Sequence, residues 1–186
     1  MPSVIDVCNK ALDKVGQNPI TSLTDGGKAA NLCNRNWPLV RDQVLRDHPW
    51  NFAMSRAALA PSTDVPAWGF TAKFPIPVDC LRLIEVRDLS TSEYQLENGC
   101  ILADATVLYI RYIKQITDPN VYDATFVDAA ATMLAIELCE PLTQNTTKKK
   151  VLYDAYDQVM LRAKSVDGQE NPPTQYEEDE WISVRY

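Results

Sequence analysis

Apolar residues repeat with helical spacing at both ends of this chain and alternate with polar residues in the middle. Residues 3–48 and 120–167 carry apolar side chains every three or four positions, which is typical of amphipathic helices. Residues 50–117 alternate with a period near two, as strands do. The pattern predicts an α+β fold, mainly a bundle of about four helices with a strand-rich antiparallel insertion.

The last residues differ from everything before them. Residues 169–186 contain a pair of prolines, a run of acids and several apolar side chains, but too few of these for a core. We therefore expect a single domain over residues 1–168 and an extended C-terminal docking arm over residues 169–186. Trp181 is the expected anchor of this arm. The predicted partner-docking residues are Tyr176, Trp181, Ile182, Val184 and Tyr186.

Capping residues set the expected limits of the first two helices. Ser3 and Asp6 have the spacing of a capping box, which predicts where the first helix begins. Gly16 is expected to end that helix, because glycine readily takes the left-handed conformation found after a helix. Thr24 or Asp25 is expected to cap the second helix.

Prolines and a glycine set the other limits. Pro38 removes one backbone donor from the second helix, which predicts a kink or a break there, and the proline after His48 ends that helix. The segment Phe126–Leu142 is apolar on nearly every face, so its own domain or a neighbouring subunit must bury it. Pro141 is expected to end this helix, and Gly168 the last one.

The stretch Arg41–Ala53 joins the helical pattern to the alternating one. A charged amphipathic helix ends at His48, and an aromatic segment follows at once. Trp50 and Phe52 are two residues apart, so in an extended chain they point to the same face. We expect this stretch to fix how the helical and strand-rich parts pack on each other.

The alternating region contains six candidate strands separated by prolines and polar turns. Asn98-Gly99 stands between two alternating runs and predicts a two-residue hairpin. The last strand is apolar on both faces, so we expect it to be covered on both sides. The candidate strands are residues 51–59, 70–76, 81–88, 93–97, 100–103 and 107–113.

Composition and charge narrow the classes of function. No apolar run is long enough to cross a bilayer, so no membrane partner is expected. The net charge of −7 disfavours a general nucleic-acid binder, which needs cationic surface, but it suits a surface that nucleic acid passes without binding. The five cysteines include no C-x-x-C pair, so we expect reduced, buried side chains made in a cytosol.

The sequence offers no arrangement typical of a reaction centre. His48 is the one histidine, and we expect it to bond backbone or favour the dipole at a helix C-terminus. Cysteines and carboxylates lack metal-ligand spacing, and no phosphate-binding loop is present. The lysines at 148–150 are expected to form a solvated first helical turn, although an acidic partner such as another subunit's tail stays open. We therefore predict no catalytic, cofactor-binding or metal-binding residues.

One region resembles a known protein family. The segments A-L-D-K-V-G and I-T-S-L-T-D, followed by A-A-N-L-C-N-R-N-W-P-L-V-R-D-Q-V-L-R-D-H-P-W-N-F-A, are similar to the opening of the tail tubular protein A family. Members of this family are head-to-tail adaptors of short-tailed bacteriophages. The match covers the N-terminal third closely and the helical C-terminal half in its organisation. Its most specific part is H-P-W-N-F-A, residues 48–53.

The resemblance implies a structural protein of the virion neck, assembled in the host cytoplasm. Copies would form a ring, usually a dodecamer, between the portal protein and a tail nozzle of tail tubular protein B-like subunits. DNA would pass down its axis without specific binding, and a C-terminal segment commonly reaches toward the portal. The alternative is a virion-associated glycan or peptidoglycan hydrolase, which would need a buried carboxylate in an acidic cleft.

Overall fold

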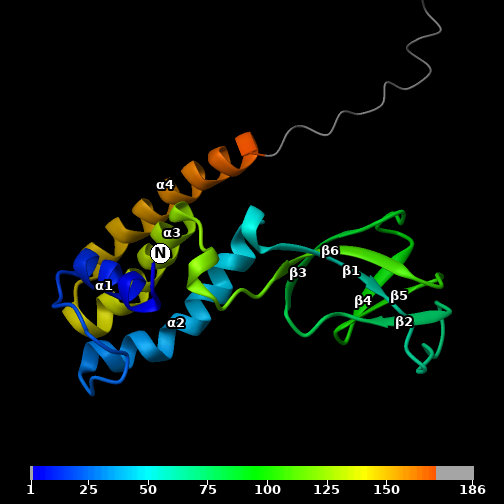
Figure 1. Cartoon of the computed structure of the whole chain (residues 1–186), viewed down its shortest axis with the longest axis horizontal. Helices are drawn as coiled ribbons and strands as arrows, with labels where there is room; N and C mark the ends of the chain where they lie inside the picture. Colours follow the sequence, from blue (N-terminus) through cyan, green and yellow to red (C-terminus); the bar gives the residue numbers. More distant parts are fainter. Residues whose placement is uncertain (1, 171–186) are drawn as a thin grey trace, which may run out of the picture.

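Helices gather at one end of the molecule and strands at the other (Figure 1). The computed structural model describes residues 2–170, so the predicted arm lies outside the described residues except for its first two positions. The described residues form helices and two antiparallel three-stranded sheets, which confirms the α+β class. The helices, together called the helical body, are α1 (Val4–Val15), α2 (Lys28–Asp47), α3 (Ala124–Thr143) and α4 (Thr146–Glu170).

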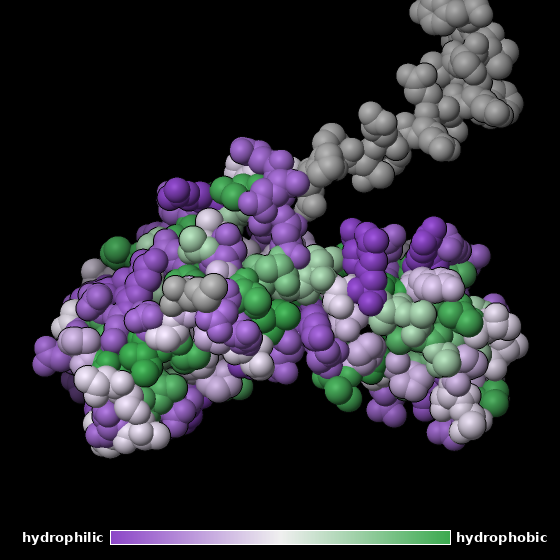
Figure 2. All heavy atoms as spheres, viewed as in Figure 1, coloured by the Kyte–Doolittle hydropathy of each residue, from purple (hydrophilic) through white to green (hydrophobic). Residues whose placement is uncertain are grey.

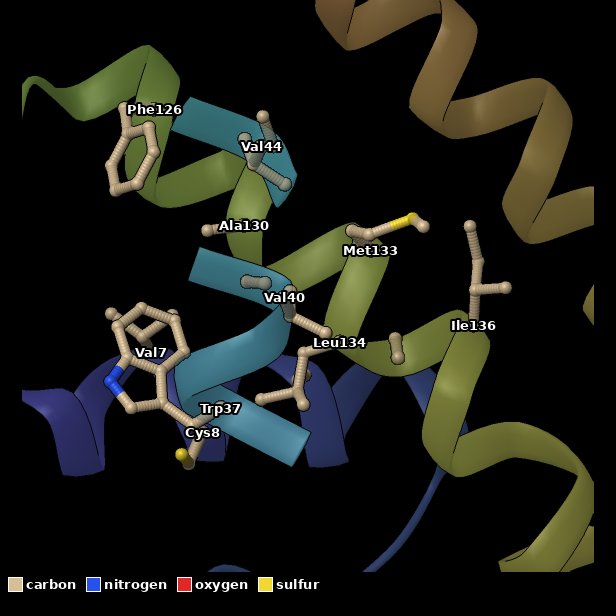
Figure 3. Close-up of a cluster of buried hydrophobic side chains, with 14 of the residues drawn as sticks. Val7, Cys8, Trp37, Val40, Val44, Phe126, Ala130, Met133, Leu134 and Ile136 are labelled. Carbon is tan, nitrogen blue, oxygen red and sulfur yellow. The ribbon is translucent and has the colours of Figure 1, made fainter. Parts of the chain in front are cut away.

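Helix α3 is the centre of the helical body. The other three helices pack around it, so the chain's own domain buries this all-apolar helix (Figure 1). Side chains from α1, α2 and α3 point toward one another in this core (Figure 3). Phe126, Leu134 and Ile136 of α3 have no exposed surface. The first two helices bury their apolar stripes here, because a one-sided helix needs a second apolar surface.

The first helix begins and ends as predicted, whereas the second begins later. The Ser3 hydroxyl accepts a hydrogen bond from the Asp6 N–H at 3.1 Å, and the Asp6 carboxylate accepts one from the Ser3 N–H at 2.7 Å. Gly16 ends α1 with a φ of 78°. Neither residue predicted to cap α2 does so. Gly27 holds the N-cap position, and the carboxylate of Asp25 instead accepts backbone N–H groups of the preceding turn.

Three residues expected to interrupt helices lie inside them. Pro38 does not break α2, because the neighbouring Trp37 is buried and packing outweighs the lost donor. Pro141 lies two residues before the end of α3, which stops where Gln144 turns to a φ of 52°. Gly168 does not end α4, which continues to Glu170. Residues 169 and 170, which the sequence assigned to the arm, belong to this helix.

The strands form two small sheets, together called the β part. The Asn98-Gly99 hairpin is confirmed: it joins β4 to β5 with φ values of 46° and 71°. Apolar side chains including Phe74 and Ile101 fill the space between the sheets. Sheet A has the order β1 (Met54–Leu59), β6 (Leu108–Lys114), β3 (Cys80–Val86), and sheet B the order β2 (Ala72–Pro75), β5 (Cys100–Ala103), β4 (Tyr94–Glu97).

Strand β6 connects the two cores. Ile113 belongs to the core of the helical body, and Ile110 to the core between the sheets. We predicted that this strand is covered on both sides. The prediction holds at the C-terminal end of β6, around Ile113, but not at Tyr109, which is 53% exposed. Because β6 contributes to both cores, it joins the helical body to the β part.

The predicted first strand begins later than expected. Residues Asn51–Ala53 form a short 3₁₀ helix, η1, and β1 starts only at Met54. Trp50 is fully buried in the helical body, and its ring centroid lies 6.2 Å from that of Phe52. The tight turn brings both rings to the core without an extended chain. A second 3₁₀ helix, η2, spans Pro119–Val121 before α3.

Candidate partner-binding surfaces

The predicted docking residues lie beyond the end of α4. Tyr176, Trp181, Ile182, Val184 and Tyr186 are all outside the described residues. The structure does describe the last turns of the helix from which their segment starts. Those turns lie against residues 41–53, where α2 ends and η1 leads into β1. We call these residues the junction. Two residues of the junction bond the end of α4, and a third bonds the middle of that helix.

A buried histidine–aspartate pair is the first of these contacts. His48 Nε2 lies 2.5 Å from Asp167 Oδ2, and the two residues are 7% and 8% exposed. His48 therefore bonds a carboxylate from a distant helix, rather than the backbone partner expected from the sequence. Burial raises the pKa of Asp167, although the hydrogen bond and charge of His48 act in the opposite direction.

Asp167 is the residue of this cluster that the sequence analysis missed. A signal for it was present: Met160, Ala163 and Asp167 repeat at helical spacing, and all three are buried. A carboxylate on the apolar stripe of a helix needs a partner, because burying a charge alone is costly. In the fold, His48 is the partner of this carboxylate.

Trp50 holds the other side of the histidine. Its indole N–H donates a hydrogen bond to the Val44 carbonyl at 2.9 Å, and this carbonyl lies in the last turn of α2. The indole stands edge-on to His48 and to Phe126, with centroid distances of 4.9 and 5.3 Å. One aromatic residue thus locks the end of α2 to the start of α3 and to the histidine that binds α4.

Two further contacts hold α4 to the junction, one from the middle of the helix and one from its last described residue. The Tyr156 hydroxyl donates to Asp47 Oδ2 at 3.0 Å, and the Asn51 amide donates to Glu170 Oε2 at 3.0 Å. The second contact joins the last described residue of the chain to η1. Any segment that follows Glu170 therefore starts from a fixed place beside the junction.

The chemistry open to this cluster is limited by its burial. His48 and Asp167 are 7% and 8% exposed, so the surrounding chain covers most of the pair. Within residues 2–170, no group of three or more His, Cys, Asp or Glu side chains could hold a metal ion. None of the helices described in the structure is long and apolar enough to cross a membrane.

The lysine cluster takes part in contacts within the chain. Lys148 Nζ donates to the Val15 carbonyl at 2.6 Å and so caps the end of α1. Lys149 Nζ pairs with Glu140 at 3.1 Å. Two of the three lysines thus have partners in the helical body, which leaves less charge for the acidic partner considered from the sequence.

The β part presents a separate exposed apolar site. Trp68 is 84% exposed and Val65 is 70% exposed, both in the connection between β1 and β2. Trp37 and Trp50 are core residues, as their patterns predict. A large apolar side chain in water is typical of a contact surface when others lie near it.

No family model matches this chain, and no curated protein matches it. Its role must therefore be argued from the residues of the junction and from the surfaces described above.

Proposed function

We propose that this chain is a structural head-to-tail adaptor of a short-tailed phage. Copies form a ring, usually a dodecamer in the tail tubular protein A family, between the portal protein and the tail nozzle. The observation that carries the proposal is the stretch H-P-W-N-F-A, residues 48–53, which is the most specific part of the resemblance to that family. In the fold these residues lie where α2, α4 and β1 meet, so the resemblance falls on the centre of the architecture.

The shape of the molecule supports a ring subunit. The helical body and the β part lie at opposite ends of a long molecule (Figure 1). A closed ring requires two different surfaces on each copy, because each subunit contacts its neighbours head to tail. A two-part molecule offers such surfaces, and a segment that starts beside the junction adds a further contact by tethering.

The charge of the chain supports a channel for DNA. With a net charge of −7 on each copy, a ring of copies carries an overall negative charge that repels the phosphate backbone. DNA can then pass without the counterion release that drives non-specific binding.

Sedimentation with purified portal protein tests the role of the C-terminal segment. A chain that ends at Glu170 is expected to keep its fold by circular dichroism, because the described contacts lie within residues 2–170, but to lose co-sedimentation with the portal. Trp181→Ala in the full chain is expected to weaken binding by about tenfold or more, as buried aromatic anchors do. Tyr153→Ala, which removes an exposed aromatic ring from the helical body, is the matched control for this segment. Undiminished portal binding by the shortened chain would contradict the proposal.

A further inference from the structure

The outer face of sheet A, turned away from sheet B, carries a cluster of arginines around one tyrosine. Arg56 of β1 lies opposite Arg111 of β6, and Arg111 lies opposite Glu85 of β3. In the next row Arg87, which follows β3, donates its backbone N–H to the Tyr109 carbonyl at 2.8 Å. We call Arg56, Arg87, Arg111 and Tyr109 the arginine face. They line a hollow of about 360 Å³.

The positive charge of this face is only partly balanced. Arg56 and Arg111 are directly opposite on adjacent strands, an arrangement that destabilises a sheet. Glu85 lies 3.2 Å from Arg111, and the exposed Asp88 lies 3.5 Å from Arg87. Within residues 2–170, Arg56 has no ion-pair partner. A bound anionic group would relieve the repulsion between the two facing arginines.

The arginine face lies next to the place where the C-terminal segment starts. Ile113 and Met54 are paired on the same side of the sheet, two residues further along each strand, where the helical body covers them. Glu170, bonded to Asn51, is close to the start of β1. Figure 2 shows strongly hydrophilic residues along the upper edge of the β part, on the same side as the end of α4.

The sequence after Glu170 has a complementary composition at a suitable spacing. Its seventh residue begins the run E-E-D-E, Glu177–Glu180, and Trp181 follows. Seven residues can span roughly 23–25 Å at ~3.3–3.6 Å each. The five residues from Asn51 to Arg56 cover at most about 18 Å on the same scale. The acidic run can therefore reach the arginines of its own chain.

We propose that the acidic run Glu177–Glu180 of this chain's own C-terminal segment binds the arginine face. Its carboxylates pair with the arginine side chains, and the exposed ring of Tyr109 lies beside them for an aromatic contact with the same segment.

A tethered segment fits this face better than a free nucleic acid does. Residues 171–186 carry four acids and one arginine, a charge of −3, so residues 1–170 carry −7 minus −3, or −4. A polyanion approaching from solution meets this net negative field. A segment of the same chain has an effective concentration of roughly millimolar or more, so exposed ion pairs worth less than about 1 kcal/mol each suffice to hold it.

This inference stands apart from the adaptor role, because it concerns the free protein and needs no portal. If the adaptor role holds as well, the segment cannot contact its own sheet and the portal at once. Docking on the arginine face would then keep the segment in place until a portal competes for it.

Arginine modification of the full-length protein tests the proposal. Phenylglyoxal reacts with accessible guanidinium groups, and mass spectrometry gives a rate for each arginine. The comparison is between the natural chain and the neutralised variant E177Q/E178Q/D179N/E180Q, whose changes lie outside the described fold. Arg56 and Arg111 are expected to react about threefold more slowly in the natural chain. The exposed Arg35 and Arg162 of the helical body are internal controls and should react equally in both proteins.

Two further measurements identify the occupant. Protection by the chain's own segment is independent of protein concentration, and it fades as salt rises from about 0.05 to about 0.5 M. Equal rates at Arg56 in the two proteins would overturn the proposal. So would protection that grows with protein concentration, which would mean a second copy, or protection removed by nuclease, which would mean nucleic acid.

Discussion

Trp50 shows how one residue can define a fold. It is fully buried, its indole N–H bonds the Val44 carbonyl at 2.9 Å, and it stands edge-on to His48 and Phe126. Its place in the core was predictable from the aromatic pattern, whereas its role as the support of a buried histidine–aspartate pair was not.

Trp50→Ala is expected to lower the free energy of unfolding by about 3–5 kcal/mol, because it removes a large buried ring and leaves the Val44 carbonyl without its donor. Urea unfolding followed by circular dichroism measures the change. Trp68→Ala is the matched control, since that side chain is 84% exposed, and it should shift stability by about 0.5 kcal/mol or less. Similar losses for both variants would show that Trp50 is not the central contact.

At the scale of elements, an ion-pair cluster joins α1 to α3. Asp128 Oδ1 lies 3.1 Å from Lys10 Nζ and 3.3 Å from Lys14 Nζ. Burial acts to raise the pKa of Asp128, but the two lysines outweigh it and hold the pKa below the ordinary value of 3.8. A carboxyl whose pKa is lowered by folding stabilises the fold above its unfolded pKa, and this stabilisation is lost as the pH falls through the folded value.

Asp128→Asn is therefore expected to reduce stability at pH 7 and to have a smaller effect at pH 3, below the unfolded pKa of 3.8. The loss at pH 7 is at most about 1 kcal/mol, because the pairs are partly exposed and screened by solvent. Urea unfolding at both pH values measures it. Asp64→Asn, an exposed loop residue, should leave stability unchanged at either pH. A deficit of Asp128→Asn that persists undiminished at pH 3 would rule out the ion pairs as its cause.

The end of α4 is held to the rest of the fold by few hydrogen bonds. Asp167→Ala removes the partner of the buried His48 and should let the last turns open, with amide hydrogen exchange over residues 163–170 faster by about tenfold. Asp154→Ala, the same change at an exposed position of this helix, is the control and should leave exchange there unaltered. Unchanged exchange in the Asp167 variant would mean that the Asn51 contact and the core packing of this helix suffice to hold its end.

The sequence predicted elements better than it predicted their ends. Long periodic segments such as α3 were correctly placed, and so was the Asn98-Gly99 turn, because these signals are local. Gly168 does not end α4 and Pro38 does not break α2, since tertiary contacts of the neighbouring Asp167 and Trp37 outweigh local preference. The pairing of His48 with Asp167 spans 119 residues, and no local pattern encodes a contact at that separation.

For the whole molecule, two cores meet along sheet A, and the segment after Glu170 starts beside that meeting point. Local positive charge on the arginine face contrasts with an acidic chain overall. A subunit with separate helical and strand surfaces, and a segment that can exchange partners, suits an assembly built step by step. The adaptor proposal unites these features.

Electron microscopy of purified virions that contain this chain tests that proposal most directly. The account predicts a closed ring of copies in the neck, between portal and tail nozzle, with density from the residues after Glu170 in contact with the portal. A map that places the chain elsewhere in the particle, or in the neck without a ring, would contradict it.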